Sequence, residues 1–290
     1  MSKSFLTLLA VAIALVASLT TASLVRHNAL TTQVAKESAY DRVMRTHTLR
    51  CGYVVYESAL MKDPNTGVFS GIIYDITELL GKRAGLKIEW AEEVSFGSMI
   101  EGLKTGRYDA LCINGWNSGG YSAFLSQTIP LYYSALDAYT WKGNNRFDHN
   151  LGAINDPSVK ISAIDGTATK VIADQNFPNA TQLTMPQTTD YITALVNVAE
   201  KKADVTFIER HAASMFMGKN PDKIQRVIKD TPIRYYANGL QMDIGENKLL
   251  AMFNMTLEEM LGSGDIDVIL DRYRKDDPSS FLPVAKPFIE

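Results

Sequence analysis

The chain has 290 residues, of which 46% are hydrophobic, and this is enough to fill the cores of two domains of ordinary size. Its 29 basic and 32 acidic residues give a formal net charge of −3, and no polybasic run follows the N-terminal segment. A nucleic-acid-binding protein normally carries a clustered basic face, so we expect no nucleic-acid partner.

The N-terminal residues have the pattern of an export signal. Lys3 is followed by an uncharged apolar run and then by small residues, with Thr20 and Ala22 placed for signal-peptidase cleavage. We expect a signal peptide over residues 1–22. The alternative is an uncleaved anchor, because residues 5–25 are just long enough for a bilayer that requires roughly 20 residues. Both interpretations place the bulk of the protein outside the cytoplasm.

Residues 23–47 are polar and predict a linker followed by a short surface helix. Strand and helix patterns then alternate, with strands expected over 49–56, 86–94 and 109–113 and helices over 71–85, ended by Gly85, and 96–108. This alternation predicts a parallel sheet covered by helices.

A second block repeats the arrangement, with strands expected over 159–164, 181–185 and 204–208 and helices over 167–177 and 189–202. In each block a helix leads to an aspartate, Asp109 or Asp204, that precedes an apolar strand. The repetition predicts two related α/β units rather than one long sheet.

After Asp230 comes an extended stretch and then two helical patterns, over 247–261 and 265–275, without strand partners of their own. We expect this tail to pack on the first unit. The predicted organisation is a discontinuous lobe I (48–138 and 233–290) and a lobe II (139–232), with hinge crossings at 138–141 and 233–237. Two such lobes enclose a cleft beyond the carboxyl ends of the strands.

Cys51 and Cys112 are the two cysteines of the chain, and each lies in a predicted strand. In an oxidising compartment they can form a disulfide. The alternative is a pair of small buried thiols that fill the core of the sheet.

The turns that follow the strands hold the candidate binding residues. In "DGTAT" (165–169), Thr167 and Thr169 lie at a helix start, where hydroxyl and backbone N–H groups suit a carboxylate or serve only to cap the helix. Phe96, Trp116 and Tyr121 lie at strand ends and either stack on a ligand or belong to the core.

Glu209 ends an apolar strand. It is either a counter-charge for a cationic ligand group or one half of a surface ion pair with Arg210 or Lys201.

Signatures of enzymes are weak or absent from the sequence. The four histidines have no metal-ligand spacing, and neither a nucleophile elbow nor a nucleotide-binding fingerprint occurs. We therefore expect no catalytic residues, no metal and no cofactor.

Residues 48–275 carry a series of motifs that runs from "TLRCGYVVY" through "FGSMIEGLKTGRYDAL" and "VKISAIDGTATKVI" to "GDIDVILDRYRK". This order resembles the extracytoplasmic solute-binding proteins of family 3, the polar amino-acid receptors of ABC uptake systems. The resemblance implies an α/β fold of two Rossmann-like lobes, the type II periplasmic binding fold, with a two-strand hinge and a ligand in the interlobe cleft. It also implies a periplasmic monomer that delivers a small-molecule solute to an ABC transporter permease.

Carried onto this sequence, the family's ligand contacts fall on Tyr56, Phe96, Trp116, Asn117, Ser118, Thr167, Ala168, Thr169 and Glu209. Glu209 stands where the family uses an aspartate to hold the α-amino group. Tyr121 stands where the family places the arginine that grips the α-carboxylate, and a neutral phenol cannot replace a guanidinium fork.

This pattern predicts a small polar, amine-bearing organic solute rather than an ordinary α-amino acid. The alternatives are a periplasmic dehydratase- or lyase-like enzyme that uses Glu209 as general acid or base, and a ligand sensor that keeps its N-terminal anchor.

Overall fold

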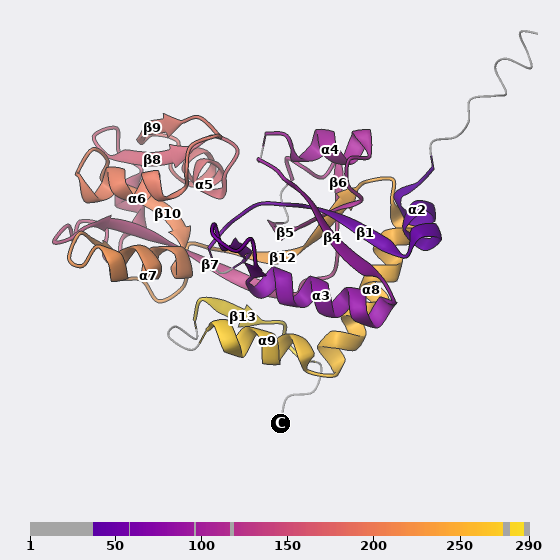
Figure 1. Ribbon diagram of the computed structural model, residues 1–290. Helices are drawn as coiled ribbons and strands as arrows, with labels where there is room; N and C mark the ends of the chain where they lie inside the picture. Colours follow the sequence, from indigo (N-terminus) through magenta and orange to yellow (C-terminus); the bar gives the residue numbers. More distant parts are fainter. Residues whose placement is uncertain (1–36, 58, 96, 117–118, 275–278, 287–290) are drawn as a thin grey trace, which may run out of the picture. The chain divides into compact units, whose positions relative to one another are not determined.

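The computed structural model describes residues 37–57, 59–95, 97–116, 119–274 and 279–286 (Figure 1). The predicted signal peptide, and the predicted linker as far as residue 36, lie outside these residues. The fold described here is that of the unit formed by residues 39–290. In this part of the chain, no helix has the length and apolar content needed to cross a membrane.

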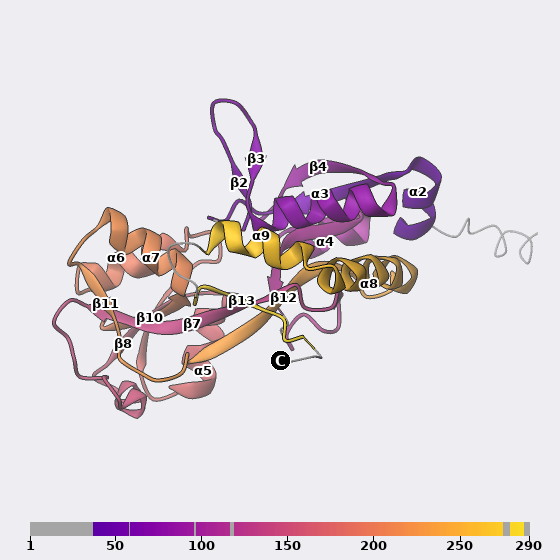
Figure 2. The ribbon, with the colours of Figure 1, turned by 90° about the horizontal axis from the view of Figure 1, so that it is seen from below.

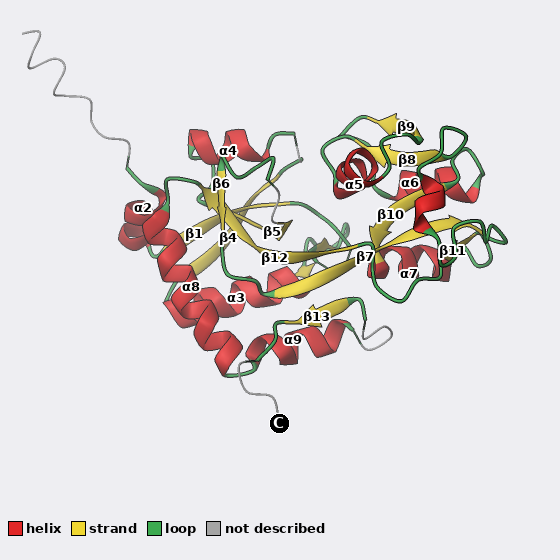
Figure 3. Cartoon of the chain, turned by 180° about the vertical axis from the view of Figure 1, so that it is seen from behind, coloured by secondary structure: helices red, strands yellow, loops and turns green. Residues whose placement is uncertain are grey.

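Most strands of the described residues belong to one hydrogen-bonded sheet with the order β4-β1-β5-β12-β7-β10-β8-β9, onto which β6, β11 and β13 pair (Figure 3). A separate hairpin, β2 (Met61–Lys62) and β3 (Phe69–Ser70), projects away from the sheet (Figure 2). The strands of the main sheet are β1 (Thr48–Tyr53), β4 (Lys87–Glu93), β5 (Ala110–Trp116), β6 (Leu125–Gln127), β7 (Tyr132–Trp141), β8 (Lys160–Ile164), β9 (Thr181–Met185), β10 (Val205–Glu209), β11 (Ile224–Arg226), β12 (Arg234–Asp243) and β13 (Phe281–Pro283).

The helices confirm the predicted alternation and add α7, which the sequence analysis did not predict. Gly85 and Gly106 end two of them in the left-handed conformation, with φ of 69° and 73°, which glycine adopts without a steric cost. The helices are α2 (Ala39–Thr46), α3 (Ile72–Ala84), α4 (Met99–Thr105), α5 (Ala168–Asn176), α6 (Ile192–Ala199), α7 (Arg210–Lys219), α8 (Asn247–Gly262) and α9 (Asp265–Tyr273), with a 3₁₀ turn at Leu151–Ile154.

Lobe I is built on a sheet that is covered on both faces. Along β5, Ala110 and Cys112 pack into a core with α3, α8 and α9, whereas Leu111 and Ile113 pack into a second core with α4. Successive residues of a strand point to opposite faces, so the first four residues of β5, from Ala110 to Ile113, are all apolar and buried.

Lobe II follows the same rule around β10. Val205 and Phe207 pack with α5 on one face, and Ile208 packs with α6 and α7 on the other. Glu209 has the same parity as Val205 and Phe207, so its side chain leaves the strand on the α5 face.

Strands β7 and β12 connect the two lobes. They pair with each other in antiparallel fashion, while β12 also pairs with β5 of lobe I and β7 with β10 of lobe II. These two strands confirm the two-strand hinge that the family resemblance implies. They also join both lobes into one hydrogen-bonded sheet, so the expectation that the two units do not share a sheet is wrong. The cores remain separate, and the lobe boundaries stay a prediction.

The C-terminal tail was predicted to lack strand partners, and this is also wrong. Strand β12 pairs with β5, β6 and β7, and β13 pairs with β7. The packing of the tail agrees with the prediction, because α8 and α9 contribute Leu249, Phe253 and Ile269 to the lobe I core (Figure 2).

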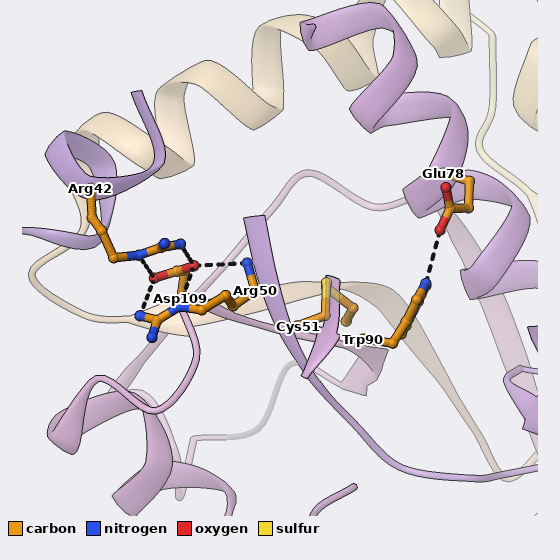
Figure 4. The surroundings of a disulfide bond; sticks show 7 residues. Arg42, Arg50, Cys51, Glu78, Trp90 and Asp109 are labelled. Atoms are coloured by element: carbon orange, nitrogen blue, oxygen red, sulfur yellow. Dashed lines mark hydrogen bonds and ion pairs between the residues drawn. A yellow bond between two sulfur atoms is a disulfide. The ribbon is translucent and has the colours of Figure 1, made fainter. Parts of the chain in front are cut away.

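A disulfide joins Cys51 on β1 to Cys112 on β5, with a Cα–Cα distance of 5.4 Å (Figure 4). Of the two arrangements that the sequence leaves open, the structure has the bonded one. Near this bond, Asp109 pairs with the guanidinium groups of Arg42 and Arg50. The lobe I sheet is thus tied by a covalent bond and a buried ion-pair cluster.

Candidate functional site

A cavity of about 600 Å³ lies where both lobes and the strands that connect them meet. Lobe I contributes the end of β5, lobe II contributes the start of α5 and the end of β10, and the connecting strands contribute residues of β7 and β12. The residues that line it include Tyr56, Ile113, Trp116, Tyr121, Leu136, Thr167, Ala168, Thr169, Gln175, Tyr191, Phe207, Glu209, Arg234, Tyr236 and Gln241.

Glu209 is the buried acid of this cavity. Its side chain belongs to a residue that is only 5% exposed, and its Oε1 has no hydrogen-bond partner among the described residues. Burial raises the pKa of the carboxyl, and the hydroxyl groups of Tyr56 and Ser134 partly offset the rise. A buried acceptor without a partner is costly, so a ligand that donates to it gains stabilisation.

The surface ion pair proposed as an alternative for Glu209 does not occur. Arg210 donates from Nε to Asp137 Oδ2 at 2.6 Å, and Lys201 lies over the Trp141 ring at 4.6 Å from its centroid. Both cations named in that alternative therefore interact with other residues.

Aromatic rings form two walls of the cavity. Tyr56 and Tyr191 approach each other with ring centroids 4.6 Å apart, and Trp116 stacks on Tyr236 at 5.0 Å. Burial raises the pKa of the Tyr56 hydroxyl well above its usual value, and the neighbouring Glu209 raises it further. The Trp116 Nε1–H, like Glu209 Oε1, has no hydrogen-bond partner among the described residues.

Strand β5 extends to Trp116, whereas the sequence analysis ended it at residue 113 and placed Trp116 in the following turn. The reason is the partner strand: Asn238 and Gly239 of β12 pair with Trp116 and Gly115 and continue the ladder. Trp116 therefore presents its ring from a strand and not from a loop.

The start of α5 lies at the cavity, but its threonine hydroxyls are arranged differently from the prediction. Thr167 Oγ1 donates to the Ile164 carbonyl at 2.7 Å, and Thr169 Oγ1 donates to the Phe207 carbonyl at 2.5 Å. Neither hydroxyl caps the helix. What remains available at this helix start is the backbone N–H groups of its first turn.

Tyr121 lines the cavity from the lobe I side. Its hydroxyl donates to the Gly166 carbonyl oxygen of lobe II at 3.5 Å, a long hydrogen bond. Burial raises the pKa of the phenol, so Tyr121 is a neutral group at physiological pH.

The structure brings seven of the predicted ligand-binding residues around one cavity: Tyr56, Trp116, Tyr121, Thr167, Ala168, Thr169 and Glu209. The other three, Phe96, Asn117 and Ser118, lie outside the described residues. Tyr191, Arg234 and Tyr236 also line the cavity and were not predicted from the sequence. Arg234 and Tyr236 alternate in the extended segment "IRYYANGL", which was interpreted only as a hinge although residues two apart on a strand share a face.

The described residues contain no group of three or more histidine, cysteine, aspartate or glutamate side chains placed to bind a metal ion. The described residues that line the cavity provide one buried carboxyl group, one guanidinium group and several aromatic rings.

Residues 55–276 match the bacterial extracellular solute-binding proteins, family 3. The chain belongs to this family. No curated protein sequence matches it.

Solved structures with the same fold include the ancestral amino-acid-binding protein AncCDT-1, a precursor of cyclohexadienyl dehydratase. It has 22% sequence identity and a TM-score of 0.70, over 82% of this chain and 99% of that one. A periplasmic His/Glu/Gln/Arg/opine family-binding protein from Silicibacter pomeroyi, in complex with lysine, has 18% identity and a TM-score of 0.67, over 82% and 100% of the chains.

An ancestral arginine-binding protein bound to arginine has 20% identity and a TM-score of 0.65, over 78% and 98% of the chains. These likenesses establish the type II periplasmic binding fold.

Proposed function

We propose that this member of the family binds a small, amine-bearing polar solute in the cavity and delivers it to an ABC transporter permease. The observation that carries the proposal is Glu209, a buried carboxylate with an unpartnered oxygen in a cavity of about 600 Å³. An ammonium group supplies both the positive charge and the N–H donors that this oxygen lacks.

The aromatic walls support the same class of ligand. The rings of Tyr56, Tyr191 and Trp116 border the cavity, and aromatic faces attract cations. Similar solved structures hold lysine or arginine, and such ligands of those proteins are consistent with an amine here.

Residues 1–22 are proposed to be a signal peptide that directs the protein to the periplasm, and the protein is proposed to act as a monomer. The extracellular character of the family and the order of charged, apolar and small residues at the N-terminus support export.

Calorimetric titration of the purified protein tests the proposal. The probes are L-lysine, L-arginine, cadaverine, agmatine and spermidine, and we expect at least one to bind with a Kd in the micromolar range or tighter. Glu209→Gln keeps the shape of the side chain but removes its charge, and should weaken that binding by about tenfold or more.

Glu258→Gln, an equivalent change on the exposed face of α8, is the matched control and should leave the Kd unchanged. If none of the amines binds, or if both variants lose affinity equally, Glu209 is not a counter-charge and the proposal is wrong.

A second candidate function is that of a dehydratase- or lyase-like enzyme. Two observations favour it: the raised pKa of the buried Glu209 suits a general acid, and AncCDT-1 is described as a precursor of a dehydratase. Proton NMR spectra of the same titrations decide between the two functions. A binding protein returns the probe unchanged, whereas turnover that disappears in Glu209→Gln assigns an enzyme.

A further inference from the structure

Among the described residues that line the cavity, two carry charge: Glu209 and Arg234. Glu209 is accounted for by the amine of the proposed solute. Arg234 is not, because an amine and a guanidinium group repel each other. The proposed amine therefore leaves the positive charge of Arg234 without an anionic partner in the ligand.

Arg234 and Glu209 lie in one row across the sheet. Leu136 of β7 pairs with Glu209 of β10 on one side and with Arg234 of β12 on the other. Directly paired residues of antiparallel strands point to the same face, so the acid and the guanidinium leave the sheet in the same direction. Two interstrand spacings separate their Cα atoms by roughly 10 Å.

The guanidinium group of Arg234 is held in place by neutral oxygens. Nη2 donates to Gln175 Oε1 at 3.1 Å and to Asn176 Oδ1 at 2.8 Å, and Nη1 donates to the Tyr236 hydroxyl at 3.4 Å. Among the described residues no carboxylate pairs with it.

Arg210 shows the contrast, since its partner is the carboxylate of Asp137. Arg234 is thus oriented without being neutralised, and five N–H donors leave it capacity for a further acceptor.

We propose that Arg234 binds a carboxylate of the solute, so that the solute is a zwitterion with its ammonium group at Glu209 and its carboxylate at the hinge strand β12. The proposal rests on the proposed function, because it assigns the second end of the same ligand. A planar fork binds a carboxylate through two parallel hydrogen bonds, which the neutral phenol of Tyr121 cannot do.

The experiment compares matched probes that differ by one carboxylate. The pairs are L-lysine with cadaverine, L-arginine with agmatine, and L-glutamate with L-glutamine, in which an amide replaces the distal carboxylate. For the wild-type protein we expect the member with the additional carboxylate to bind about tenfold more tightly or better in at least one pair.

Arg234→Gln should bring the members of that pair to within about threefold of each other, and Arg234→Lys should keep part of the preference because the charge remains without the fork. Arg107→Gln, which removes an arginine paired with Glu92 on the lobe I surface, is the matched control and should keep the full preference. Thermal unfolding without ligand shows that each variant is folded.

The outcomes separate this proposal from the proposed function. If amines bind but no pair shows a preference for the carboxylate, the role of Arg234 is overturned while the function stands. If Arg234→Gln weakens both members of a pair equally, Arg234 only positions the end of α5, and the proposal is also overturned. If nothing binds, both proposals fall together.

Discussion

Lobe I and lobe II place an aspartate at the same junction, directly before a central strand. Asp109 accepts a hydrogen bond from the backbone N–H of Arg50 at 2.8 Å, and Asp204 accepts one from that of Lys160 at 2.9 Å. In return, each aspartate donates its own backbone N–H to the carbonyl of the same residue. The repetition noticed in the sequence is therefore a repeated hydrogen-bonded junction.

The two junctions differ in the ion pairs that neutralise their aspartates. The Asp109 side chain is 1% exposed and pairs with two arginines, Arg42 and Arg50 (Figure 4). The Asp204 side chain is 24% exposed and pairs with Arg146 at 2.6 Å. Lobe I adds the disulfide, and within the described residues lobe II has no equivalent cross-link.

The lobes also differ in what they present to the ligand cavity. The described lobe I residues at the cavity are uncharged, whereas lobe II presents Glu209 and the hinge strand presents Arg234. The comparison indicates that lobe I is the more firmly held half, whereas lobe II and the hinge carry the charges that are proposed to select the ligand.

The largest effect is expected from removal of the disulfide. Replacing Cys51 and Cys112 together by alanine opens a loop of 61 residues, and closing such a loop in the unfolded chain is worth roughly 4 kcal/mol. Urea unfolding of the two proteins measures the loss.

Hydrogen exchange locates this loss, because protection should fall in β1 and β5 more than in β8 and β10. A loss below about 1 kcal/mol, or equal loss of protection in both lobes, would contradict the view that the cross-link sets lobe I apart.

The next largest effect is expected from the paired aspartates. Asp109→Asn leaves two arginines without their buried counter-charge and should cost about 3 kcal/mol of unfolding free energy. Asp204→Asn removes a partly exposed ion pair and should cost about 1 kcal/mol or less.

The two variants are matched controls for each other, since each keeps an oxygen that can accept the backbone hydrogen bond. If urea unfolding shows equal losses of unfolding free energy for the two variants, the junctions are equivalent and the burial of Asp109 adds nothing to stability.

Much of the fold could be predicted from the sequence because it depends on local patterns. The helices α3 and α8 have long apolar stripes, and Gly85 marks where α3 ends. The connecting strands could not be assigned in this way, because β7 and β12 gain their partners from segments far away in the chain. Whether such a segment is a hinge crossing or part of a continuous sheet depends on those partners.

The candidate site was partly predictable for the same reason. Glu209 ends an apolar strand and Thr167 lies three residues after one, and positions at the carboxyl ends of strands suggest a cleft. Arg234 was missed because it begins a strand and lies far from Glu209 in the sequence. Only the register through Leu136 places the two charges in one row.

The smallest effect on the unfolding free energy is expected from Glu209→Gln in the absence of ligand. Unlike the substitutions above, it should stabilise the protein at neutral pH. Burial raises the pKa of Glu209 in the folded protein, so the unfolded chain loses this proton at a lower pH than the folded one. As pH rises from about 4.5 through the raised pKa, the wild-type protein should therefore lose stability relative to the glutamine variant.

Above that range the glutamine variant should be more stable by on the order of 1 kcal/mol, because a neutral amide avoids the desolvation cost of a buried carboxylate. Urea unfolding at a series of pH values measures the difference, with Glu258→Gln as the variant that should show none. A wild-type protein that is more stable than Glu209→Gln at neutral pH would mean that lobe II satisfies its own buried charge. The proposed contrast between a stable lobe I and a ligand-selecting lobe II would then be wrong, because Glu209 would stabilise the ligand-free fold and would not need an ammonium group as its partner.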